Sequence, residues 1–110
     1  RDYIHVVDLA KAHVSALKWM ELNPGKTDVF NVGTGNGNSV LEVVKAFEKV
    51  SGAKLNYNFG PRRAGDVVKI YAGSDKSNQE LNWKTEYSIE ESLRDAWNWE
   101  LKLKEKNETL

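Results

Sequence analysis

The chain contains no cysteine, a single methionine and two prolines among its 110 residues. The absence of cysteine excludes disulfide bonds and thiolate-ligated zinc sites, and it is compatible with a reducing compartment. No apolar run approaches the roughly 20 residues of a membrane-spanning helix, and we expect no secretion leader. Sixteen basic side chains balance sixteen acidic ones, so the net charge gives no reason to expect nucleic acid or a membrane as a partner.

The hydrophobic content of 40% is ordinary for a globular protein. The length suits one small domain, or part of a larger one. A domain of this size buries roughly two-thirds of its unfolded surface, which makes its stability marginal. The chain begins with Arg1 rather than methionine, and the segment Tyr3–Val7 already has the pattern of a strand. We therefore expect a piece of a longer protein.

Four helices are predicted. Asp8 is the expected N-cap of a helix that runs to about Leu22, and a short helix is expected over residues 75–81. Two Ser-x-x-Glu capping boxes open the other helices, and Gly52 suits the left-handed end of the first of these. The boxes are Ser39 with Glu42 and Ser88 with Glu91. From Lys102 onward the charges alternate, so we divide the chain into residues 1–101 and a charged, frayed tail of residues 102–110.

Short strands are predicted between these helices. They cover Val29–Val32 and Leu55–Phe59, with a further extended segment over Val67–Ala72. The predicted fold class is therefore α/β, with short strands, about four helices and more helix than sheet. Because the strands are few and short, we expect at least one to pair with strands outside this chain.

The glycine-rich turn Gly33–Asn38 follows a predicted strand and precedes a helix, as a dinucleotide-binding turn does. It departs from that pattern because Asn38 replaces the third glycine. The acidic residue expected at the end of the next strand is also missing, since that strand ends at Phe59 and Gly60. We interpret the segment as a tight turn followed by a helix cap.

The segment Pro61–Asp66, PRRAGD, is the second candidate for ligand binding. Its two arginines carry planar donor groups that match phosphate oxygens, and Asp66 offers an acceptor for sugar hydroxyls. Taken alone, a solvated arginine turn is the commoner case. Arg1 is a further plausible phosphate ligand, whereas His5 fits a packed core histidine better than a catalyst. No catalytic triad, zinc spacing or paired-carboxylate motif stands out.

The order of the segments is more specific than any one of them. RDYIHVVDLAKAH, FNVGTGNGNSVLEVVKAFEKVSG, PRRAGDV and YAGSDKSNQELNW together resemble the C-terminal stretch of UDP-galactose 4-epimerases, also called UDP-glucose 4-epimerases. These enzymes belong to the extended short-chain dehydrogenase/reductase superfamily. The resemblance extends from Arg1 to about Trp99, and it implies the C-terminal, substrate-binding portion of a Rossmann-type parent fold.

The resemblance also implies roles for single residues. Arg1 and Arg63 would hold the diphosphate of a UDP-sugar, and Asp66 would accept hydrogen bonds from the uridine ribose. Tyr3 would lie near the nucleotide. Ile70 stands where this family limits the size of the sugar pocket; its intermediate size leaves the acceptance of N-acetylated sugars open, and we expect plain hexoses as the main substrates.

The implied reaction interconverts UDP-glucose and UDP-galactose by transient oxidation at C4 with tightly bound NAD, helped by a tyrosine base and a lysine. No tyrosine of this chain is followed by lysine four residues later. We therefore expect that these residues alone neither bind NAD nor catalyse epimerisation. The resemblance further implies a cytoplasmic, homodimeric parent, and the isolated piece is expected to self-associate through an exposed apolar face.

Two alternatives stay open from the sequence. One is another sugar-nucleotide enzyme of the same superfamily, such as a dehydratase or a decarboxylase. The other is a stand-alone binding module without catalysis. The sequence upstream of Arg1 would separate these readings.

Overall fold

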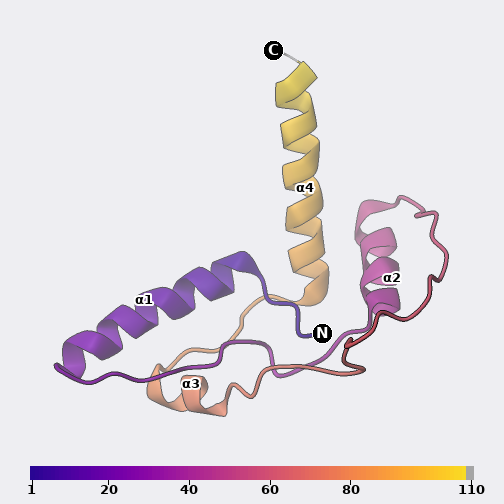
Figure 1. The fold of residues 1–110 in the computed structure, drawn as a ribbon. Coiled ribbons are helices and arrows are strands. Elements are labelled where there is room, and N and C mark those ends of the chain that lie inside the picture. The colour runs from indigo at the N-terminus through magenta and orange to yellow at the C-terminus, as the bar shows by residue number, and fades with distance from the viewer. Residues whose placement is uncertain (109–110) are drawn as a thin grey trace.

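The computed structural model describes residues 1–108, and this part of the chain contains four α-helices and no β-strand. Helices α2 and α4 lie side by side, whereas α1 extends away from them and the short α3 lies apart from the pair (Figure 1). The molecule is elongated, with extents of 51 × 41 × 23 Å. The helices are α1 (Val6–Leu22), α2 (Val40–Ser51), α3 (Asp75–Glu80) and α4 (Ile89–Glu108).

Both predicted capping boxes are confirmed. The Glu42 N–H donates to the Ser39 hydroxyl at 3.1 Å, and the Ser39 N–H donates to the Glu42 carboxylate at 3.0 Å. Ser88 and Glu91 exchange the same pair of bonds at the start of α4. Gly52 ends α2 with a φ of 72°, in the left-handed region that glycine adopts without steric cost.

The predicted start of α1 is wrong. The helix begins at Val6, so the strand expected over residues 3–7 does not form. Its N-cap is His5, whose Nδ1 accepts a hydrogen bond from the Val7 N–H at 3.0 Å. Asp8 lies instead in the first turn, where its acidic group favours the positive end of the helix dipole.

The other predicted strands do not form within residues 1–108 either. A strand needs a neighbouring strand to pair its backbone groups, and here side chains bind some of those groups instead. The Ser77 hydroxyl donates to the Asn31 carbonyl at 2.5 Å, and the Ala72 N–H donates to the Asp2 carboxylate at 3.2 Å. The expected four helices are thus confirmed, whereas the expected strands over residues 29–32, 55–59 and 67–72 are absent from the described chain.

Helix α4 continues through Glu108, so the segment from Lys102 is helical where a frayed tail is expected from the sequence. An exposed helix tolerates alternating charges because its polar face meets water. Residues 109–110 lie outside the described residues. Within residues 1–108, no helix has the length and the apolar character required to cross a membrane.

The apolar core is small. Its buried members are Ala12 of α1 together with Leu81 and Trp83, which follow α3. On the other side of the molecule, the rings of Phe47 and Trp97 meet edge to face at 5.3 Å between α2 and α4. Much apolar surface remains exposed: Leu17 and Met20, which the helical spacing of α1 predicts as buried, are 61% and 59% exposed.

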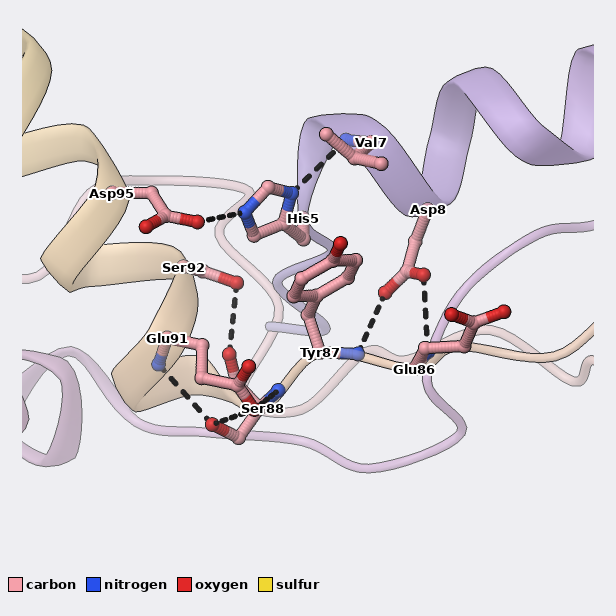
Figure 2. Close-up of polar contacts among 9 residues, drawn as sticks. All are labelled: His5, Val7, Asp8, Glu86, Tyr87, Ser88, Glu91, Ser92 and Asp95. Atoms are coloured by element: carbon pink, nitrogen blue, oxygen red, sulfur yellow. Dashed lines mark hydrogen bonds and ion pairs between the residues drawn. The ribbon is translucent and has the colours of Figure 1, made fainter.

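Asp8 links α1 to the segment between α3 and α4. It is completely buried, and its two carboxylate oxygens accept the N–H groups of Glu86 and Tyr87 at 3.0 and 3.1 Å (Figure 2). The Asp8 carbonyl also accepts the indole N–H of Trp83 at 2.9 Å. One residue therefore fixes the loop that carries Trp83 into the core.

We predict that Asp8→Asn lowers the free energy of unfolding by about 2 kcal/mol. The amide nitrogen of asparagine would face a backbone N–H group, and it cannot accept a hydrogen bond from that group. Urea unfolding followed by tryptophan fluorescence measures this change. Glu21→Gln, an equivalent change at an exposed position of the same helix, is the control and should leave stability unchanged. Equal stability of the two variants would contradict the assignment.

Candidate functional site

The carboxylate of Asp2 joins three distant segments. Its Oδ1 accepts the hydroxyl and the N–H of Thr34 at 2.6 and 3.0 Å. Its Oδ2 accepts the N–H groups of Gly35 and Ala72 at 3.0 and 3.2 Å. Residue 2 therefore brings the glycine-rich turn and the segment around residue 72 to the N-terminus of the chain.

The glycines of this turn have a structural reason. A Cβ at Gly33 would lie 2.6 Å from the Cβ of Ala72 and 2.7 Å from Oδ2 of Asp2, closer than atoms can approach. Gly35 has a φ of 78°, a conformation that L side chains rarely adopt. The turn thus presents its N–H groups to an internal carboxylate. These bonds and the left-handed glycine are features of a tight turn.

The hydrogen bonds also change the acidity of Asp2. Burial by itself would raise the pKa of this carboxyl group. The bonds from the Thr34 hydroxyl and from the N–H groups of Thr34, Ala72 and Gly35 outweigh burial, and the pKa is lower than its ordinary value of 3.8. Asp2 is therefore a charged acceptor at neutral pH.

Arg1, Arg63 and Asp66, which the sequence assigns to one site, come together. Nη2 of Arg1 lies 2.6 Å from Oδ1 of Asp66, and Nη2 of Arg63 lies 3.5 Å from Oδ2. The Arg1 guanidinium also donates to the Val67 carbonyl at 3.1 Å. The bond from Arg1 is the main reason that the pKa of Asp66 is lowered; burial opposes the shift and Arg63 adds to it.

Ile70 lies beside this cluster. It lines an open cavity of about 420 Å³ together with Arg1, Asp2 and Tyr71. Volumes of this order are typical of small-molecule sites. Tyr3 is half-buried, and no hydrogen bond within the described residues joins it to Arg1 or to the arginine loop. Arg1 thus belongs both to the ion-pair cluster and to the cavity of Ile70, whereas Arg63 and Asp66 are not among the residues that line this cavity. Tyr3 has no visible role in the cluster.

A second polar cluster surrounds His5 (Figure 2). Its Nε2 lies 2.7 Å from the Asp95 carboxylate of α4, and its ring stacks on that of Tyr87 with a centroid distance of 4.3 Å. Because Nδ1 accepts from the Val7 N–H, the proton of the neutral ring lies on Nε2. Both ring nitrogens have protein partners and the residue is 7% exposed, so the interpretation of His5 as a packed core histidine is confirmed.

A larger groove, of about 550 Å³, lies between α1 and the segment after α3. Lysines line it, and one of them, Lys11, is paired with Glu86 at 2.9 Å. None of the residues that the sequence assigns to a ligand belongs to this groove. Its size alone therefore does not make it the candidate site.

The fold matches part of an extended short-chain dehydrogenase/reductase. The solved UDP-glucose-4-epimerase of Stenotrophomonas maltophila, with bound NAD and formylated UDP-arabinopyranose, superposes with a TM-score of 0.91 at 38% identity, over 96% of this chain and 31% of that one. The Bifidobacterium longum UDP-glucose 4-epimerase, in complex with NAD+ and UDP, gives a TM-score of 0.86 at 46% identity, over 93% of this chain and 30% of that one.

Sequence comparison finds similarity to the same kind of enzyme. UDP-glucose 4-epimerase GEPI48 of Cyamopsis tetragonoloba is 54% identical over 101 residues, which cover 90% of this chain and 28% of the relative. No protein-family model matches the chain. The chain is a homologue of UDP-glucose 4-epimerases, and it spans less than a third of the length of these relatives.

Sequence reasoning missed Asp2 and Thr34. Asp2 stands next to the predicted phosphate ligand Arg1, and Thr34 lies between two glycines that follow a predicted strand. A turn rich in glycine signals backbone N–H groups that converge on an anion. The sequence does not reveal that this anion is a side chain 32 positions earlier.

We predict that Asp2 makes stability depend on pH in the acid range. Its pKa is lower in the folded than in the unfolded state, so its contribution is complete above the unfolded pKa of about 3.9 and is lost as the pH falls through the folded pKa. Urea unfolding between pH 2 and 6 should show wild type more stable than Asp2→Asn above pH 5, with the two converging in acid. A constant difference over this range would contradict the prediction.

Proposed function

We propose that these residues form the UDP-sugar-binding part of a UDP-glucose 4-epimerase, which interconverts UDP-glucose and UDP-galactose at C4 with bound NAD. The observation that supports the proposal is that Arg1 contacts Asp66, 65 positions later in the sequence, and that Arg63 contacts the same carboxylate. Arg1 also lines the cavity that contains Ile70. Solved relatives that bind UDP or a UDP-sugar share this fold.

The charges of the cluster suit a nucleoside diphosphate. Two guanidinium groups face a single carboxylate, so the cluster of Arg1, Arg63 and Asp66 carries a net positive charge. The Arg63 side chain is 81% exposed, which leaves its planar donor group accessible to phosphate oxygens. Asp66 would then accept hydrogen bonds from the ribose hydroxyls while it orients Arg1.

Ile70 would contact the sugar. It lies four residues after Asp66 and lines the same cavity as Arg1. Its branched apolar side chain reduces the room for an N-acetyl group, and we therefore propose plain hexoses as the main substrates. We also propose that Tyr3 lies near the nucleotide, and this proposal rests on the family resemblance alone.

The chain does not itself hold the redox chemistry of the proposed reaction. The N–H groups of Thr34 and Gly35 bind Asp2, and no Tyr-x-x-x-Lys pair is present in the sequence. NAD and the catalytic tyrosine and lysine would belong to other residues of a longer protein. A cytoplasmic location, homodimerisation of that protein and self-association of the isolated piece stay predictions.

We predict that Arg63→Lys in the full-length protein raises the dissociation constant of UDP about 10-fold to 100-fold, because an ammonium group cannot replace the two-pronged donor geometry of arginine. Isothermal titration with UDP measures the change. The neighbouring Arg62→Lys is the matched control and should change the constant less than twofold. Equal effects of the two substitutions on the dissociation constant would contradict a specific role of Arg63 in UDP binding.

We also predict that purified residues 1–110 do not interconvert UDP-glucose and UDP-galactose, even with added NAD. The reason is the missing tyrosine and lysine pair. A coupled assay for UDP-glucose formation, run beside the full-length protein, checks this. Turnover by the 110 residues that scales with their concentration would show that the catalytic groups lie within them.

A further inference from the structure

Two parts of the proposed site lie far apart in the sequence. Arg1 would contact the diphosphate, and Ile70 would limit the sugar pocket. For both to act on one ligand, their separation must be fixed to a fraction of an ångström, since small displacements weaken recognition strongly. No β-sheet within residues 1–108 provides that rigidity.

Asp2 provides the connection instead. It follows Arg1 directly, and its carboxylate binds the N–H of Ala72, which lies two residues after Ile70. The Arg1 carbonyl also accepts the N–H of Asn38 at 2.8 Å, and the terminal amino group of Arg1 donates to the Asn38 carbonyl at 2.9 Å. The Arg1 side chain then reaches Asp66 and Val67. The loop between residues 66 and 72 is thus tied to residues 1–2 at both of its ends.

The glycine-rich turn completes this arrangement. The N–H of Thr34 donates to Oδ1 of Asp2, and the N–H of Gly35 donates to Oδ2. Donors on both oxygens therefore fix the orientation of the carboxylate. The Thr34 hydroxyl is itself held, because it accepts the N–H of Asn36 at 3.0 Å. Gly33 allows Ala72 and Asp2 to approach without a side chain between them.

We propose that Asp2 is a positioning residue for the UDP-sugar site: it sets the location of Arg1 relative to Ile70, and it does so through the turn Gly33–Gly35. This inference rests on the proposed function. It predicts that loss of the Asp2 carboxylate weakens diphosphate binding and also changes how strictly Ile70 discriminates between plain and N-acetylated hexoses. It further assigns the glycine-rich turn, which resembles a nucleotide-binding turn, to the alignment of the substrate site.

The test is isothermal titration of the full-length protein with UDP, UDP-glucose and UDP-N-acetylglucosamine. The variants are Asp2→Asn, Thr34→Val and Thr34→Ser. Thr34→Val removes one donor to Asp2, whereas Thr34→Ser retains it. Asp28→Asn is the matched control. Asp28 also accepts a hydrogen bond from a backbone N–H and pairs with a lysine, but it lies outside the cavity.

We expect Asp2→Asn to raise the dissociation constant of UDP about 10-fold to 100-fold at unchanged stoichiometry, with a smaller difference between UDP-glucose and its N-acetylated counterpart. Thr34→Val should raise the UDP constant about 5-fold, and Thr34→Ser and Asp28→Asn less than twofold.

A purely structural role has a different signature. If Asp2→Asn only unfolds part of the sample, the stoichiometry falls while the dissociation constant of the folded fraction stays the same, and this result would overturn the inference. If Thr34→Ser weakens binding as much as Thr34→Val, the inference also fails. Normal binding by Asp2→Asn together with weak binding by Arg63→Lys would refute only the positioning role. Absence of UDP binding by wild type would refute the proposed function itself.

Discussion

The carboxylate of Asp2 is the constraint on which the arrangement of the candidate site depends. It is charged, partly buried and bound by donors from residues 34, 35 and 72. Hydrogen bonds to a charged acceptor are among the stronger ones in proteins, and a buried charge without them is costly. The loops that carry Arg63, Asp66 and Ile70 have no helix or strand of their own, so their position follows from these bonds and from the Arg1–Asp66 ion pair.

Polar side chains that bind distant segments recur at every third residue along the N-terminal segment. After Asp2, His5 binds Asp95 of α4 and stacks on Tyr87. Asp8 then binds the backbone that leads into α4. With only three buried apolar residues among those described, the chain relies on buried polar anchors to hold its helices and loops together. Apolar side chains of α1 that stay exposed, such as Leu17 and Met20, do not contribute to the core.

The local features of this fold follow from the sequence, because capping boxes, glycine ends and helical spacing act within a few residues. The predicted start of α1 and the predicted strands are wrong because they depend on partners far away in the sequence. His5 rather than Asp8 caps α1 because the helix begins at Val6, and Asp8 binds the N–H groups of residues 86 and 87 instead. The segment 29–32 has the composition of a strand, but residues 1–108 contain no strand with which it could pair. Arg1, Arg63 and Asp66 could be grouped from the family resemblance, whereas the bond between Asp2 and Thr34 crosses 32 positions and leaves only the glycines as a signal.

The central claim is that Asp2 aligns Arg1, Arg63, Asp66 and Ile70 to grip one UDP-sugar. The most direct measurement is a crystal structure of the full-length protein with UDP-glucose. We predict that both guanidinium groups lie within about 3 Å of diphosphate oxygens, that Asp66 lies at the ribose hydroxyls, and that the Asp2 bonds to the turn are unchanged. A diphosphate bound away from Arg1 and Arg63, for example at the lysine-lined groove beside Trp83, would contradict it.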